Sequence, residues 1–177
     1  HRYGKEDSRM KVFVTGVAGQ LGHDVIDELA KRGYEGIGSD LHLKDGISMD
    51  ITDPELVSKT LIAVKPDVVI HCAAWTAVDL AEEADKKDLV MKINSVGTQY
   101  IADACNVLNS KMIYLSTDYV FDGQGTNPWH PDCKDYRPLN VYGASKLAGE
   151  QAVAKTLDKY FIVRIAWVFG RNGKNFI

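Results

Sequence analysis

A glycine-rich turn, Gly16-Val-Ala-Gly19-Gln-Leu-Gly22, constrains the fold of this chain more than any other feature of its sequence. It follows a short apolar run and opens a segment with helical spacing. In such a turn the first glycine permits the tight bend, the second lets the backbone approach a pyrophosphate, and the third lets helix and strand pack closely. The phosphates then lie against N–H groups at the positive end of the helix. A plain turn without a ligand is the alternative, whereas a P-loop is excluded because no Gly-Lys-Ser/Thr follows.

Strand and helix patterns alternate along the rest of the chain. Apolar runs predict strands at residues 10–15, 36–40, 67–72, 112–116 and 160–165. Helical spacing of apolar residues predicts helices at 20–32, 54–64, 84–109 and 142–157. The strands are continuous apolar runs, as parallel strands covered on both faces require. We therefore expect an α/β fold with a doubly wound parallel sheet, which is a Rossmann-type NAD(P)-binding domain.

Length, composition and charge fit one globular domain. The chain has 177 residues, 45% of them hydrophobic and 25% charged, and its net charge of -3 gives no reason to expect nucleic acid. The longest apolar stretch, residues 68–78, is too short to span a membrane. We interpret residues 1–9 as a leader or expression remnant and residues 10–177 as the domain. Within it, the loop 121–140 is long for a compact domain, and such loops are often lids or substrate loops.

The three cysteines, Cys72, Cys105 and Cys133, are odd in number, widely spaced and without a CxxC pair. This pattern favours a reducing compartment, by default the cytoplasm, and predicts no disulfide framework. The histidines are scattered without the spacing of metal ligands, so no metal site is predicted.

Asp40 follows the second predicted strand, 18 residues after Gly22. A carboxylate at this place can accept hydrogen bonds from the adenosine ribose hydroxyls and would repel a 2′-phosphate. The residue therefore favours NAD(H), although Lys44 is close enough in sequence to reach the same region. A solvated loop aspartate is the alternative.

Tyr142 and Lys146 lie four residues apart at the start of a predicted helix, which puts both side chains on one face. A nearby ammonium favours the phenolate and should lower the pKa of the tyrosine from its ordinary value of about 10. Thr117 follows a predicted strand at the carboxyl edge of the sheet, where ligands bind. Together they predict carbonyl reduction: Tyr142 donates the proton, Thr117 polarises the oxygen, and Lys146 tunes Tyr142 and orients the nicotinamide ribose. Alone, this tyrosine–lysine spacing indicates no more than a surface helix.

These residues resemble a known group of enzymes. The glycine turn together with Tyr-x-x-x-Lys is similar to the extended short-chain dehydrogenase/reductase family. More narrowly, the blocks CAAWTAVD (72–79), LSTDYVFDG (115–123) and PLNVYGASKLAGE (138–150) resemble the dTDP-4-dehydrorhamnose reductases. The resemblance implies reduction of the 4-keto group of a nucleotide-linked sugar by NADPH or NADH, from dTDP-4-dehydrorhamnose to dTDP-L-rhamnose.

The resemblance also implies roles for the residues that match the family's motifs. The cofactor would be held by Gly16, Gly19, Gln20 and Leu21 at the pyrophosphate, Asp40 at the adenosine ribose, Asp50 and Ile51 beside the adenine, Ala73, Ala74 and Thr76 on the nicotinamide side, and Tyr142 and Lys146. The catalytic residues would be Thr117, Tyr142 and Lys146. The sugar would face Thr117, Asp118, Tyr119 and Trp167. As alternatives, Ala73 and Ala74 could be core filler and Trp167 a packed aromatic.

Two departures from the family pattern matter. Leu80 occupies a position where members usually carry a lysine, which does not touch the chemistry. The C-terminal stretch that builds much of the family's substrate lobe is largely missing from this chain.

A dehydratase is disfavoured because Tyr119, rather than a glutamate, follows Thr117-Asp118. A related epimerase and a non-catalytic NADP-binding regulatory subunit of the methionine adenosyltransferase type are alternatives. The exact sugar, the choice between NADPH and NADH, a homodimer and an unplaced Mg²⁺ stay open.

Overall fold

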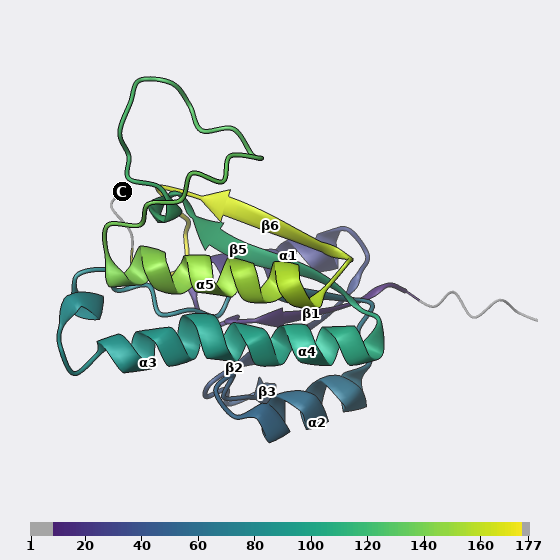
Figure 1. Ribbon diagram of the computed structural model, residues 1–177. Helices are drawn as coiled ribbons and strands as arrows, with labels where there is room; N and C mark the ends of the chain where they lie inside the picture. Colours follow the sequence, from purple (N-terminus) through teal and green to yellow (C-terminus); the bar gives the residue numbers. More distant parts are fainter. Residues whose placement is uncertain (1–8, 175–177) are drawn as a thin grey trace, which may run out of the picture.

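The computed structural model describes residues 9–174 as a six-stranded sheet with helices on both faces (Figure 1). Its elements are β1 (Lys11–Thr15), α1 (Gln20–Lys31), β2 (Glu35–Asp40), β3 (Ile47–Ser48), α2 (Pro54–Val64), β4 (Val68–His71), η1 (Leu80–Glu82), α3 (Lys87–Met91), η2 (Lys92–Gly97), α4 (Thr98–Leu108), β5 (Lys111–Thr117), η3 (Asp118–Val120), α5 (Val141–Thr156) and β6 (Tyr160–Ile165). Residues 1–8, most of the predicted leader, lie outside the described residues, as do residues 175–177.

The strands follow the order β3-β2-β1-β4-β5-β6, and every neighbouring pair is parallel. All six carboxyl ends therefore meet at one edge of the sheet. The order along the chain reverses between β1 and β4, which lie side by side with Thr15 opposite His71. Open α/β sheets bind ligands outside the carboxyl ends at such a point. The predicted doubly wound parallel sheet is confirmed, and its topology places the site at this edge.

The helices form two layers of unequal extent. Figure 1 shows α2, α4 and α5 side by side across one face, with α1 behind the sheet against β1 and β2. The core between sheet and helices is fully buried at Phe13, Leu61, Val69, Ile101 and Met112. The glycine turn therefore joins a buried strand to the helix on the less covered face.

Most predicted elements are present, with two differences. Asp53, directly before Pro54, caps α2 by accepting from the Leu56 N–H at 3.0 Å. The two-residue strand β3 was not predicted because two residues carry no periodic signal. The predicted helix 84–109 begins at Lys87 and contains the π-helical segment η2. Single π turns of this kind often occur at functional sites.

The expectation that the strands are covered on both faces is wrong for β6. The residues Val12, Phe13 and Val14 of β1 are at most 3% exposed, whereas Phe161 and Val163 of β6 are 70% and 40% exposed. The strand β6 lies at the edge of the sheet, where α5 packs on one face while α1 lies against β1 and β2. An apolar run therefore does not show by itself that a parallel strand is covered.

Candidate active site

The glycine turn closes against the segment that follows β4. Gly16 has a φ of +75°, and a Cβ there would stand 2.7 Å from the backbone nitrogen of Ala73. Gly22 packs so closely on the carbonyl group of Gly16 that a side-chain carbon would overlap it. The helix α1 begins at Gly19 without a side-chain cap. An uncapped helix N-terminus behind so tight a turn fits a pyrophosphate.

Asp40 ends β2 beneath the same turn. One carboxylate oxygen accepts from the Ala18 N–H at 3.0 Å, and the other accepts from the Leu41 N–H at 2.7 Å. The bond to Ala18 was not predicted from the sequence, because 22 residues separate the partners. A carboxylate has about four lone-pair sites, so it can also accept from ribose hydroxyls. Asp40 therefore orders the turn and keeps the capacity to accept further hydrogen bonds.

His71 lies buried at the carboxyl end of β4 and is 1% exposed. Its Nδ1 is 2.7 Å from Thr15 Oγ1 and its Nε2 is 3.0 Å from Thr98 Oγ1. Thr98 donates its own proton to the Asn94 carbonyl, so His71 carries its proton on Nε2 and accepts from Thr15 at Nδ1. Burial lowers the pKa of His71 to about 3, which keeps the ring neutral. Thr15 also accepts from the Ala73 N–H at 3.0 Å, so this network fixes the wall of the glycine turn.

Asn94, in the π-helical segment η2, clamps the segment after β4 to α5. Its Oδ1 accepts from the Trp75 N–H at 2.7 Å, and its Nδ2 donates to the Trp75 carbonyl and to Ser145 Oγ. Ser145 in turn donates to the Tyr142 carbonyl at 2.7 Å. Asn94 therefore holds the segment predicted to line the nicotinamide against the first turn of α5. In this segment Ala73 and Ala74 are half-buried and Thr76 is exposed.

Asp50 and Ile51, predicted to flank the adenine, lie between β3 and α2. Asp50 Oδ1 accepts from the N–H and the hydroxyl of Thr52, which lowers the pKa of the carboxyl group. Ile51 is 7% exposed, and its side chain belongs to the core cluster. Its side chain therefore packs inward, and a contact with an adenine would fall to its backbone.

Thr117 and Tyr142 meet where β5 ends and α5 begins. Asn140 caps α5 by accepting from the Gly143 N–H at 2.6 Å. The Thr117 hydroxyl donates to Asp118 Oδ1 at 3.1 Å. Burial raises the pKa of Tyr142 above its ordinary value, and the neighbouring Thr117 side chain partly offsets that rise. The Tyr142 phenol is therefore protonated at neutral pH.

Lys146 lies one turn after Tyr142 and is 3% exposed. Its Nζ donates to the Leu115 carbonyl at 2.6 Å and lies 4.3 Å from the centre of the Tyr114 ring. Burial lowers the pKa of Lys146 to about 7. The prediction that Lys146 lowers the pKa of Tyr142 is wrong in direction, because burial of the phenol dominates and the lysine points to Leu115.

The predicted sugar-facing residues divide into two groups. Asp118 and Tyr119 lie directly beside Tyr142, with the Tyr119 ring edge-on to it at 5.9 Å. Trp167 stands on the segment after β6 and is 78% exposed. Its backbone has a φ of 54°, in the left-handed region that is uncommon for a non-glycine residue.

Sequence reasoning missed several residues that support this site. Glu82 Oε1 accepts from the Val141 N–H at 2.6 Å, at the first turn of α5. Glu150, 3% exposed, forms a bidentate ion pair with Arg164 at 2.9 and 2.7 Å. The spacing of four between Lys146 and Glu150 could have indicated a shared helix face. Glu82 carries no such signal, because 59 residues separate it from its partner.

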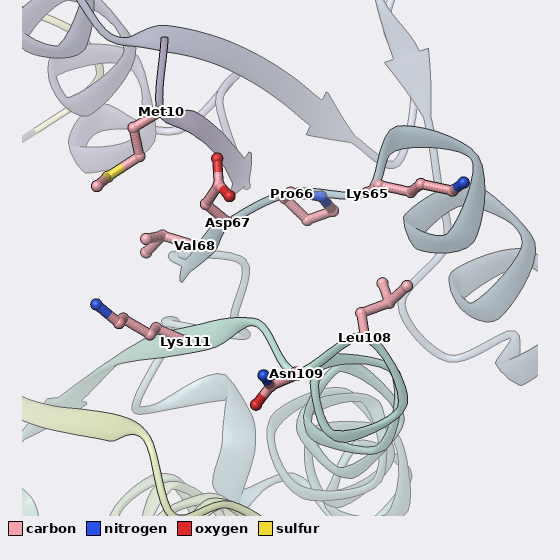
Figure 2. Close-up of a pocket in the computed structure, with 8 residues that line it drawn as sticks. All are labelled: Met10, Lys65, Pro66, Asp67, Val68, Leu108, Asn109 and Lys111. Carbon is pink, nitrogen blue, oxygen red and sulfur yellow. The ribbon is translucent and has the colours of Figure 1, made fainter. Parts of the chain in front are cut away.

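One hollow of the surface lies away from this site. It has a volume of about 540 Å³ and lies near the amino ends of β4 and β5. Figure 2 shows the residues that line it: Met10, Lys65, Pro66, Asp67, Val68, Leu108, Asn109 and Lys111. It lies at the opposite edge of the sheet from Thr117. Within residues 9–174, no group of three His, Cys, Asp or Glu side chains is placed to hold a metal ion. No helix in the same range is long and apolar enough to cross a membrane.

Known proteins are similar to this chain in sequence and fold. The dTDP-4-dehydrorhamnose reductase of Streptomyces griseus is 41% identical over 170 residues, which are 96% of this chain and 53% of that relative. The crystal structure of a dTDP-4-dehydrorhamnose reductase from Clostridium acetobutylicum matches with a TM-score of 0.86 at 40% identity, covering 94% of this chain and 56% of that one. The Bacillus anthracis dTDP-4-dehydrorhamnose reductase in complex with NADP matches with a TM-score of 0.84 at 38% identity, over 94% and 57%.

The chain thus spans about half the length of the curated relatives that it matches. The matched half contains the glycine turn, the Tyr142–Lys146 pair and all six strands. Residues 10–177 match the family described as the RmlD substrate binding domain. This chain belongs to that family.

Proposed function

We propose that the protein carrying this chain is an NAD(P)-dependent oxidoreductase that reduces the 4-keto group of a nucleotide-linked sugar, dTDP-4-dehydrorhamnose, to give dTDP-L-rhamnose. The observation that carries the proposal is the placement of Thr117 at the end of β5 and of Tyr142 and Lys146 at the start of α5, at the strand edge that also holds the glycine turn. The names of the relatives, at 38–41% identity, support the same reaction.

The cofactor side of the site fits NADPH or NADH. The backbone at Gly16, Gly19, Gln20 and Leu21 would hold the pyrophosphate, because α1 begins there without a side-chain cap. Asp40 would accept from the adenosine ribose, Asp50 and the Ile51 backbone would border the adenine, and Ala73, Ala74 and Thr76 would line the nicotinamide side. Lys146 would turn from the Leu115 carbonyl to hold the nicotinamide ribose. The bound dinucleotide supplies the hydride.

Tyr142 would donate the proton that the reduced carbonyl oxygen needs. Its raised pKa suits an acid, because the phenol keeps its proton until the oxygen becomes strongly basic. The Thr117 hydroxyl would leave Asp118 and donate to the same oxygen, stabilising the charge that develops there. Burial lowers the pKa of Lys146 to about 7. A phenolate that forms beside it would favour the charged ammonium form of the lysine.

The sugar would bind against Thr117, Asp118, Tyr119 and Trp167. The exposed rings of Tyr119 and Trp167, 44% and 78% accessible, offer apolar faces to a pyranose ring. We place the reaction in the cytoplasm, in keeping with three unpaired cysteines, and we name a sugar nucleotide, rather than nucleic acid or a membrane, as the partner. The solution mass of the full-length protein tests for a homodimer, and chelation tests for a use of Mg²⁺.

The test is a titration of NADPH and NADH into the full-length protein, followed by addition of dTDP-4-keto-6-deoxy-L-sugar. We expect tight cofactor binding and then loss of the reduced-nicotinamide absorbance, with dTDP-L-rhamnose as the product. Tight binding without cofactor oxidation would contradict the reductase. The regulatory-subunit alternative would then be tested by adding a methionine adenosyltransferase, and the epimerase alternative by following sugar conversion at constant nicotinamide absorbance.

A further inference from the structure

Arg164 on β6 joins three parts of the molecule. Its Nε and Nη2 donate to the two carboxylate oxygens of Glu150 at 2.9 and 2.7 Å. Nη2 also donates to the hydroxyl of Tyr136 at 3.1 Å. Glu150 lies on α5, one turn after Lys146, whereas Tyr136 lies in the long loop 121–140. One guanidinium group therefore connects the edge strand, the catalytic helix and the loop.

Aromatic side chains of the loop stack around the same guanidinium group. Its central carbon lies 5.1 Å from the ring centre of Phe121 and 5.3 Å from that of Tyr136. The Phe121 ring stacks on Trp129 at 4.4 Å, with an interplanar angle of 8°, and on Tyr136 at 5.8 Å. Phe121 is 6% exposed although it begins a loop. We call Arg164, Phe121, Trp129 and Tyr136 the latch.

The three aromatic residues of the latch come from the start, the middle and the end of the loop, which has no helix or strand of its own. A loop of this length without secondary structure needs side-chain anchors to hold one conformation. Phe121 directly follows η3, where Asp118 and Tyr119 lie beside Tyr142. The other end of the loop is Asn140, the cap of α5. Both ends of the loop therefore reach the candidate active site.

We propose that the latch positions the loop 121–140 as one wall of the nucleotide-sugar site, so that Trp129, Tyr136 and Arg164 are positioning residues for substrate binding. This inference rests on the proposed function, because the substrate class comes from it. Arg164 is fixed by Glu150 and is always charged, which makes it a rigid base for the rings. The rings reach it from the loop, so releasing them frees the loop without breaking the ion pair.

The variants that test the latch leave Arg164 and Glu150 in place, because removing one partner of a buried ion pair destabilises the fold. Trp129→Ala removes the outer ring of the stack, and Tyr136→Ala removes a ring together with the hydrogen bond to Arg164. Tyr136→Phe keeps the ring and removes the hydroxyl alone. His130→Ala is the matched control, since it removes an exposed ring from the same loop outside the latch.

Hydrogen exchange by mass spectrometry reports the loop directly. The Arg137 N–H donates to the Val120 carbonyl at 3.0 Å, so its exchange measures whether the loop is held. We expect roughly tenfold faster exchange across 122–139 in Trp129→Ala and Tyr136→Ala, a smaller rise in Tyr136→Phe, and none in His130→Ala. Exchange in β1 and α1 should not change. Wild-type exchange in both alanine variants would overturn the latch.

Steady-state kinetics on the full-length protein tests the link to the substrate. We expect KM for the dTDP-4-keto sugar to rise about tenfold in the two alanine variants, with KM for NADPH within about twofold of wild type. A purely structural role would instead lower both affinities or only the melting temperature. A freed loop with an unchanged sugar KM would overturn the positioning role. Wild-type protein that does not oxidise NADPH would contradict the proposed function, while the exchange data would still decide whether the latch holds the loop.

Discussion

The proposed cofactor side and the proposed sugar side of the strand edge differ in the exposure of their side chains. On the proposed cofactor side Thr15, His71 and Asn94 are each 1% exposed, and their side-chain polar atoms are paired. On the proposed sugar side Tyr119 and Trp167 are 44% and 78% exposed. The first region is a closed hydrogen-bond network, and the second presents accessible aromatic rings.

This difference predicts that the two surfaces differ in how far they are preorganised for binding. The cofactor wall is preorganised by residues from β1, β4 and η2, so it should bind a dinucleotide with little rearrangement. The proposed sugar wall includes a loop and a tryptophan with a left-handed backbone. Variants on the two sides should therefore separate cofactor affinity from turnover.

The largest expected effect is loss of turnover in Tyr142→Phe. This change removes the acidic proton and keeps the ring, so kcat should fall by about 10²–10⁴-fold. Affinity for NADPH, measured by fluorescence titration, should stay within a few-fold because the glycine turn is untouched. Normal turnover in this variant would sink the proposed role of Tyr142 and would leave the cofactor side unaffected.

Gly22→Ala should damage the cofactor side by distorting the turn. A Cβ at Gly22 would overlap the Gly16 carbonyl group, whereas a Cβ at Gly19 would stand 3.3 Å from the Gly16 oxygen. We expect Gly22→Ala to lower the free energy of unfolding by about 1–3 kcal/mol and to weaken cofactor binding. Gly19→Ala, as the matched variant, should be milder in chemical denaturation. Equal loss of stability in the two variants would contradict the conclusion that Gly22 packs more tightly on Gly16 than Gly19 does.

The sequence was sufficient for the fold where local signals and topology agree. The glycine turn and the apolar runs each have a short-range physical cause, and the turn, the helix after it and the parallel strands that they predict are present. The two residues of β3 and the π-helical turn η2 escaped prediction, because neither has a periodic pattern of its own. The exposure of β6 also escaped, since it depends on its place at the edge of the sheet.

The sequence was enough to predict the candidate catalytic residues. It was not enough to predict the hydrogen bonds and the pKa shifts around them. Thr117, Tyr142 and Lys146 were found by spacing and by position after a strand. Their electrostatics could not be found in this way, because burial decides the pKa of Tyr142 and a sequence does not show burial. Asn94 and Arg164 act on partners 19 and 14 residues away, across the fold, and no local motif marks such contacts.

His71 should make the cofactor side sensitive to acid. Its pKa is lowered from about 6.5 in the unfolded chain to about 3 in the folded protein, so below pH 6.5 the unfolded state takes up a proton that the folded state refuses. Stability should therefore fall as the pH drops from about 6.5 towards 3, by up to about 1.4 kcal/mol per pH unit from this group. Denaturation of His71→Gln should show a shallower slope, with exposed His23→Gln as the control. Identical slopes in all three proteins would contradict the assignment.

Asp40→Ala should alter the choice of cofactor. Loss of the carboxylate removes an acceptor for the ribose hydroxyls of NADH and also a charge that repels the 2′-phosphate of NADPH. We expect Kd for NADH to rise about tenfold and Kd for NADPH to change less. Asp40→Asn keeps an acceptor for the Ala18 N–H and separates the order of the turn from the charge. Equal weakening of both cofactors by Asp40→Ala would mean that Asp40 orders the turn and does not discriminate between them.

The smallest expected effect concerns the start of α5, where the two sides meet. The exposed Glu82 carboxylate accepts from the Val141 N–H, and a negative charge at a helix N-terminus is stabilising. Glu82→Gln keeps an acceptor and removes the charge, so kcat should change by no more than about twofold. Asn140→Ala, which removes the local cap, should cost about 1 kcal/mol of stability and lower kcat further, because the first turn carries Tyr142. If Glu82→Gln lowered kcat more than Asn140→Ala did, the remote carboxylate rather than the local cap would set the position of Tyr142.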